Sequence, residues 1–113
     1  MPSLADAARG ADLLVCEVFV DREMQPTEGV RSPETIAALR SYHMVPKEVA
    51  AVAKEAGSKA LALTHLVPPS ANRAALVAEI RETYPGPVIL GEDLMAVDVA
   101  ARTIAFPGLC VGY

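Results

Sequence analysis

The sequence contains two histidines, His43 and His65, and each stands where an imidazole could take part in chemistry. His65 directly follows the apolar run 60–64, which is typical of a buried strand. In open α/β sheets, ligands bind beyond the carboxyl ends of the strands, so His65 would lie at such a position. His43 lies just before the helix that Pro46 opens. The helix that leaves His43 and the strand that returns to His65 could bring both imidazoles to one edge of the sheet.

The acidic and thiol side chains near these positions leave several interpretations open. Glu17 is the charge within the apolar run 12–20, and a buried carboxylate needs a partner unless it points outward at the strand end. Cys16 is expected to be a small buried apolar residue, and Glu92–Asp93 fits a solvated turn. A zinc site takes three or four ligands, and no spacing requires these side chains to join the histidines. The simpler interpretation is that each histidine is an ordinary hydrogen-bonded residue.

Composition excludes several classes of protein. The chain has 113 residues, of which 52% are hydrophobic and 21% charged, so it is not intrinsically disordered. Its net charge of −4 and the lack of a basic patch argue against binding of a nucleic-acid backbone by this segment alone. The two cysteines make no disulfide framework, which predicts a reducing, cytoplasmic setting. No run of 18 apolar residues predicts a membrane span, and no signal peptide is expected.

Helix and strand signals alternate along the chain. Ser32 and Pro33 are typical of a helix start, and Gly57 of a helix end. The predicted elements are helix 4–9 ended by Gly10, strand 12–20 covered on both faces, helix 33–41, helix 46–56, strand 60–66, a long helix capped by Ser70, strand 88–90, and a closing hairpin of 95–99 with 103–106. This β-α-β-α-β order predicts one α/β domain over 1–113, with a parallel sheet and helices on one face. The sequence assigns no role to the apolar tail 107–113.

Four blocks of sequence together resemble a known family. They are A-D-L-L-V-C-E at 11–17, H-M-V-P-K-E-V-A at 43–50, A-L-A-L-T-H at 60–65, and P-V-I-L-G-E-D-L-M at 87–95. In order and spacing they resemble the C-terminal part of the metallo-β-lactamase fold, within its ribonuclease Z-like and arylsulfatase-like hydrolases. The resemblance implies the β-α-β-α-β half of an αββα sandwich with a C-terminal β-hairpin.

The resemblance also implies roles for individual residues. His65 matches the last ligand of a dinuclear metal centre, usually zinc. His43 matches the histidine that donates a proton to the leaving group, although Met44 and Val45 replace the small hydroxyl residues that usually follow it. Glu17 matches a glutamate of the family, which implies a structural or supporting role for it. Independently of the resemblance, the position of Thr64 next to His65 makes it a candidate to hold that residue in place. In such a centre, two metals polarise a phosphoryl or carbonyl oxygen and generate a hydroxide nucleophile.

The metal-binding half of that family is missing from the sequence. Neither the H-x-H-x-D-H signature nor the G-D-T block occurs, and one imidazole cannot hold a dinuclear centre. The first hypothesis is therefore a C-terminal fragment of a zinc-dependent hydrolase of phosphodiester or related esters, inactive alone and relying on a complementary N-terminal half. The alternative is a stand-alone α/β oligomerisation or binding module without catalysis, and the high apolar content predicts a homo-oligomer. A third possibility is an unrelated α/β domain whose histidines are incidental.

Overall fold

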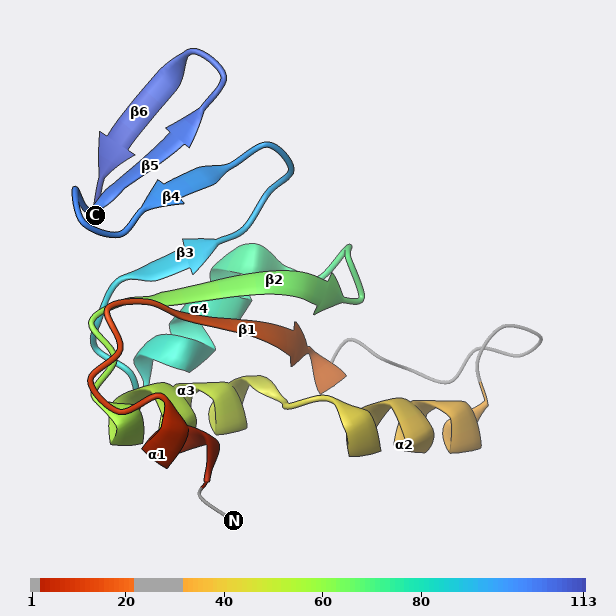
Figure 1. Ribbon diagram of the computed structural model, residues 1–113. Coiled ribbons are helices and arrows are strands. Elements are labelled where there is room, and N and C mark those ends of the chain that lie inside the picture. The colour runs from red at the N-terminus through yellow and green to blue at the C-terminus, as the bar shows by residue number, and fades with distance from the viewer. Residues whose placement is uncertain (1–2, 22–31) are drawn as a thin grey trace.

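The computed structural model describes residues 3–21 and 32–113, apart from the side chain of Tyr42. Its elements are, in chain order, α1 (Leu4–Ala7), β1 (Leu14–Phe19), α2 (Pro33–Tyr42), α3 (Pro46–Ala56), β2 (Leu61–Val67), α4 (Arg73–Arg81), β3 (Val88–Leu90), β4 (Ala96–Asp98), β5 (Thr103–Phe106) and β6 (Leu109–Gly112). They form two sheets (Figure 1). Strands β1, β2 and β3 are parallel neighbours in that order, and β4, β5 and β6 are antiparallel neighbours. The predicted β-α-β-α-β unit and the closing hairpin are confirmed.

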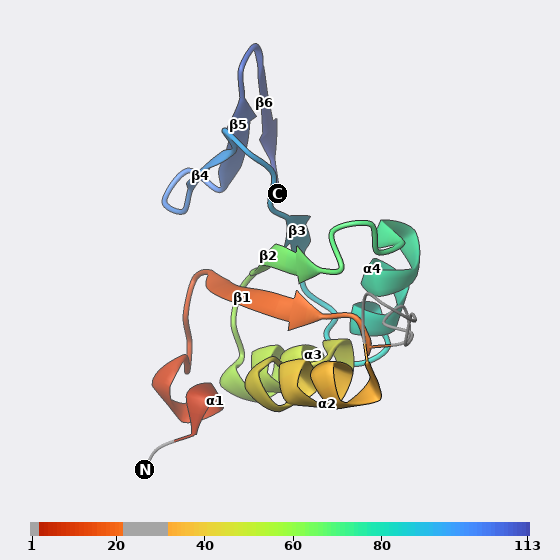
Figure 2. The ribbon, with the colours of Figure 1, turned by 90° about the vertical axis from the view of Figure 1, so that its right-hand side faces the viewer.

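The helices lie on one face of the parallel sheet, as predicted (Figure 2). Helix α3 shows how the sequence produces this packing. Pro46 opens it, Val49 and Ala53 fall on one side and are fully buried, and Gly57 ends it in the left-handed region at φ 66°. The main core consists of Leu14, Cys16, Val18, Val20, Val49, Ala50, Ala53, Leu61, Leu63, Leu66, Ala71, Leu76, Ile80 and Tyr84. None of the helices in the described part of the chain is long and apolar enough to cross a membrane.

The prediction that the first strand is covered on both faces is wrong. Burial alternates along β1 up to Glu17: Leu14 and Cys16 are buried, whereas Val15 is 58% exposed and Glu17 is also exposed. The helices cover only the side that carries Leu14 and Cys16. On the other side of β1, the apolar side chain of Val15 therefore stays accessible to solvent, and the charged side chain of Glu17 is tolerated.

The start of α4 also differs from the prediction. Asn72, and not Ser70, caps this helix, and its side-chain oxygen accepts a hydrogen bond from the backbone N–H of Ala75 at 2.9 Å. Ser70 lies in the preceding turn. Both residue types are good helix caps, so only the path of the chain after β2 decides between them.

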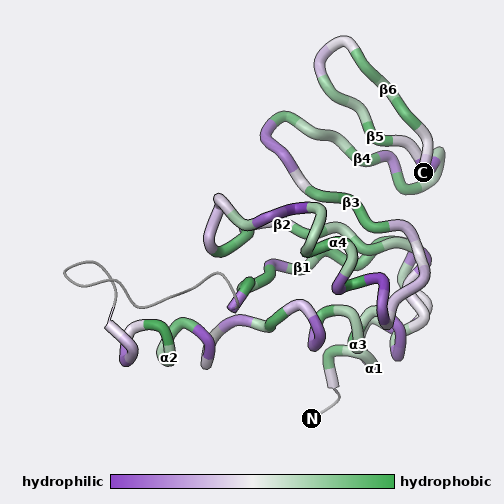
Figure 3. Tube along the Cα trace, turned by 180° about the vertical axis from the view of Figure 1, so that it is seen from behind, coloured by the Kyte–Doolittle hydropathy of each residue, from purple (hydrophilic) through white to green (hydrophobic). Residues whose placement is uncertain are grey.

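The second sheet has one apolar face. Val97, Ile104 and Val111 lie opposite one another across its three strands, and Phe106 lies opposite Leu109. Opposed residues and every second residue of a strand share a face, so these five side chains lie on one side of the sheet. None of them is fully buried. Figure 3 shows the hydrophobic colour along β6.

The tail 107–113, which has no predicted role, forms β6 and completes this sheet. Gly108 adopts φ 82°, a conformation that suits glycine, in the turn that leads into β6. Arg102 holds the end of the chain, because its Nε donates a hydrogen bond to the carbonyl of Tyr113 at 3.2 Å and its guanidinium lies 4.9 Å from the Tyr113 ring centre. The tail is thus a paired strand.

Candidate functional site

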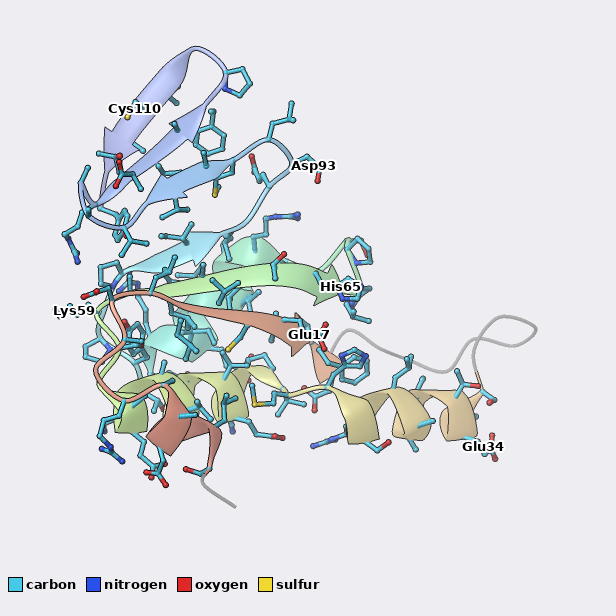
Figure 4. The ribbon with its side chains drawn as sticks, in the orientation of Figure 1. Glu17, Glu34, Lys59, His65, Asp93 and Cys110 are labelled. Carbon is cyan, nitrogen blue, oxygen red and sulfur yellow. The ribbon has the colours of Figure 1, made fainter. Side chains whose placement is uncertain are left out.

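One carboxylate joins the two histidines. The Nδ1 atom of His43 lies 2.9 Å from Oε1 of Glu17, and the Nδ1 atom of His65 lies 3.0 Å from Oε2 of the same side chain. The side chain of His43 is 17% exposed, that of Glu17 44% and that of His65 68%. Figure 4 shows Glu17 and His65 at the carboxyl ends of neighbouring strands. The structure therefore brings the two imidazoles to one edge of the parallel sheet and places Glu17 in hydrogen-bond contact with both.

An irregularity in strand pairing directs His65 toward Glu17. Glu17 of β1 pairs with Thr64 of β2, but the next pair is Val18 with Leu66, so His65 is an extra residue in β2. Its backbone is left-handed at φ 48°, a region that histidine tolerates better than most residues. As a result His65 remains exposed at the strand end, while Leu66 takes the next core position.

The end of α2 and the end of β1 hold His43. His43 caps α2 in an extended conformation at φ −124° and ψ 147°. Its imidazole is stacked on the ring of Phe19, with ring centroids 6.2 Å apart and planes 22° apart. The backbone N–H of Phe19 donates to the carbonyl of Met44 at 2.9 Å, which ties the chain after His43 to β1. The two imidazoles meet edge to face, with centroids 6.3 Å apart.

Hydrogen bonds control the charge of Glu17. The pKa of its carboxyl group is lowered below the usual value, first by the hydrogen bond from His65 and then by that from His43, while desolvation acts in the opposite direction. An ionised carboxylate can only accept, so each Nδ1 must carry the donated proton. The Nε2 atom of each ring is then the atom left for a metal or for proton transfer.

A cavity of about 390 Å³ adjoins this cluster. The open face of the parallel sheet, the turn after β3 and the first part of the second sheet line it. The lining residues are Leu13, Val15, Ala62, Leu63, Thr64, His65, Gly91, Glu92, Asp93, Met95 and Val97. The lining therefore combines apolar side chains with His65 and two carboxylates, Glu92 and Asp93.

Comparison with known proteins shows what this chain is similar to. No family model matches the chain. The chain is 36% identical over 103 residues to a ribonuclease Z from Myxococcus xanthus and 33% identical over 106 residues to one from Haloarcula marismortui. A crystal structure of the metallo-β-lactamase fold protein YhfI from Bacillus subtilis superposes with a TM-score of 0.57 at 28% identity, covering 81% of this chain and 33% of that protein. The chain has the metallo-β-lactamase fold and is similar to part of the ribonuclease Z proteins.

These matches cover most of this chain but only a small part of each relative. Alignments to the two ribonuclease Z relatives cover 89% and 93% of this chain but only 30% and 29% of the relatives. The chain thus spans about 30% of the length of the curated relatives that it matches. The resemblance inferred from the four sequence blocks is confirmed, and the architecture is the implied half of an αββα sandwich.

The residues present fit part of a zinc site of this metallo-β-lactamase fold. In protein metal sites, a ligating histidine usually donates its second ring N–H to a carboxylate, and His65 makes this contact with Glu17. The exposed His65 ring also borders the cavity. A catalytic zinc needs three protein ligands, however, and residues 3–21 and 32–113 contain no group of three or more His, Cys, Asp or Glu arranged to hold a metal. His65 fits as a single ligand.

The remaining candidate residues from the sequence do not contact the two imidazoles by hydrogen bonds in the described chain. Thr64 is exposed, pairs with Glu17 across the strands and borders the cavity. Glu92 and Asp93 are exposed residues that line the cavity, and the hydrogen bonds of the two imidazoles in the described chain go to Glu17 instead. Cys16 is buried on the opposite side of β1 from Glu17, and burial raises the pKa of its thiol.

Sequence reasoning missed Phe19, which the structure places against His43. The available signal was weak. An aromatic residue at the end of an apolar strand is typical of a core, and only the packing of β1 against the segment after α2 gives it a histidine as neighbour.

Proposed function

We propose that this chain is one part of a metal-dependent hydrolase that cleaves phosphodiester bonds, and that it is inactive alone. The observation that carries the proposal is the single carboxylate of Glu17, which accepts hydrogen bonds from both imidazoles. His65 is the metal ligand through Nε2, and Glu17 fixes its orientation. The relatives are named ribonuclease Z, which favours RNA as the class of substrate.

His43 is the proton donor in this proposal. When bound, two zinc ions would polarise the phosphoryl group and make a water molecule more acidic. As the oxygen of a hydroxide ion forms a bond to phosphorus and the bond from phosphorus to the leaving oxygen breaks, Nε2 of protonated His43 gives its proton to that leaving oxygen. His43 is then neutral and keeps its Nδ1–H hydrogen bond to Glu17.

The missing ligands come from a complementary polypeptide. Val15 on the open face of the parallel sheet and the apolar face of β4–β6 offer it a hydrophobic surface. The chain is acidic overall, with net charge −4, so contacts to an RNA backbone come from that polypeptide. The proposed setting is cytoplasmic, in line with the two free thiols.

The test is reconstitution. The purified chain is mixed with zinc and with the part of the Myxococcus xanthus ribonuclease Z that it does not match, and hydrolysis of an aryl phosphodiester is measured. We expect turnover only in the mixture. His43→Ala should lower kcat about 10²–10⁴-fold with unchanged zinc content, whereas His65→Ala should lower both zinc content and turnover. Turnover that survives His65→Ala with full zinc content would refute the proposed ligand.

A stand-alone oligomerisation module is the second candidate. The apolar face of β4–β6, with no fully buried member, favours it. Light scattering on the isolated chain separates the two functions. A stable, zinc-independent oligomer that does not respond to the complementary polypeptide would favour the module, and a chain that associates with that polypeptide would favour the hydrolase.

A further inference from the structure

We infer that Phe19 is a positioning residue for His43, which sets the plane of the imidazole and so the direction of its Nε2 atom. This inference rests on the proposed function in one respect, the donation of a proton by Nε2 of His43. The placement of the ring can be tested without activity.

Phe19 makes two contacts near His43, one through its ring and one through its backbone. Its ring is fully buried and stacks with the His43 imidazole at a centroid distance of 6.2 Å, within the usual range for an aromatic pair. Its backbone N–H also holds the carbonyl of Met44, the residue after His43. Phe19 therefore contacts the side chain of His43 and also holds the backbone of the next residue, Met44.

The hydrogen bond from His43 to Glu17 cannot do this alone. The Nδ1–H···O contact restrains the two side-chain torsions of His43, but hydrogen-bond angles are broad, so a range of ring tilts remains. The ring of Phe19 narrows this range, because the planes of the two stacked rings lie within 22° of each other. The carboxylate and the phenyl ring together define both the position and the tilt of the imidazole.

Phe19 is itself held by a small cluster. It packs with buried Val45 and with partly buried Ile36, Leu39 and Val67, which come from α2, the segment before α3, and β2. This cluster is separate from the main core. A substitution at Phe19 can therefore loosen His43 while the main core stays intact, and Leu39 offers a matched control in the same cluster.

The first test uses the unaltered 113-residue chain. NMR should show nuclear Overhauser effects between the ring protons of Phe19 and those of His43, together with a ring-current displacement of the His43 ring protons. If these signals are absent, the inference is wrong, whatever the activity of the protein.

The second test compares Phe19→Leu with Leu39→Ala. We expect Phe19→Leu to abolish the ring-current displacement and to broaden or average the His43 ring signals. Leu39→Ala should lower stability without these changes, and an identical response of both variants would overturn the inference. In the reconstituted enzyme, Phe19→Leu should lower kcat more than it changes KM, with a greater loss for poorer leaving groups. Intact stacking signals without that kinetic effect would count against proton donation by His43 and leave the positioning by Phe19 standing.

Discussion

Oε1 of Glu17 and Nδ1 of His43 lie 2.9 Å apart, although 26 positions separate the two residues in the chain. The other oxygen of Glu17 takes a hydrogen bond from His65, which lies 48 positions away. The carboxylate is therefore the only group in the described chain that contacts both imidazoles by hydrogen bonds. Its removal should affect two histidines through one substitution.

Glu17→Gln tests this shared support. An amide oxygen is a weaker acceptor than a carboxylate and its NH₂ group cannot accept, so at least one imidazole should lose its Nδ1–H preference. We expect the nitrogen chemical shifts of both histidines to show mixed tautomers. In the reconstituted protein, zinc affinity should fall about 10–100-fold, as for other outer-shell partners of metal-bound histidine. Glu55→Gln, on the exposed side of α3, is the matched control, and equal effects of both substitutions would contradict the assignment.

The charge of Glu17 should produce a measurable dependence on pH. Its pKa in the folded chain is lowered by the hydrogen bonds from His65 and His43, relative to about 4.3 for an ordinary glutamate. The ionised form thus contributes stability above the unfolded pKa, and this contribution is lost as the pH falls through the lowered folded pKa. Carbon NMR of the Glu17 carboxyl group should give a midpoint below the ordinary value, and a double His43→Ala, His65→Ala variant should move that midpoint upward. A midpoint at or above the ordinary value would be inconsistent with the geometry.

Zinc binding by the isolated chain should be weak. His65 can supply one ligand, and three or four are needed for a closed or catalytic site. Isothermal titration of the chain with zinc should show no tight uptake of a metal pair, and the weak heat that remains should disappear in His65→Ala. Tight binding of two zinc ions per chain would mean that this chain alone holds a complete centre, contrary to the expectation.

Leu94→Gly should stabilise the chain. Leu94 is 81% exposed and adopts φ 66°, so its side chain contributes little packing while its backbone lies in the left-handed region. That conformation costs a non-glycine residue about 1–2 kcal/mol, part of which glycine loses again through its greater unfolded-state freedom. We expect the free energy of unfolding to rise by about 0.5–1 kcal/mol in urea denaturation. Leu109→Gly, in the paired strand β6, should lower it, and the same sign for both substitutions would argue against strain at Leu94.

Local signals explain why much of the fold could be predicted from the sequence. Ser32 and Pro33 mark the start of α2, and Pro46 and Gly57 bracket α3, through contacts within a few residues of each other. The start of α4 was predicted at the wrong residue because Ser70 is an equally good cap when it is considered alone. A local pattern identifies the type of element more reliably than its first residue.

The geometry of the candidate site depends on contacts between distant segments. The sequence indicated that Glu17 needed a partner or an exit to solvent, and in the structure it has both partners and partial exposure. The extra residue at His65 follows from the pairing of β1 with β2, which no local pattern encodes. Likewise, the tail becomes β6 only because β5 lies beside it. Such features require the register between strands, which a single sequence does not reveal.

The position of β6 has a practical consequence for anyone handling this protein. As the outermost strand of its sheet, it presents unpaired backbone groups beside Leu109 and Val111, both of which face solvent. Such a strand is a template onto which further molecules can add, so concentrated stocks should cloud or form fibrils sooner than dilute ones. A lysine in place of Val111 should keep preparations clear for longer, since a charge on the outermost strand discourages such stacking.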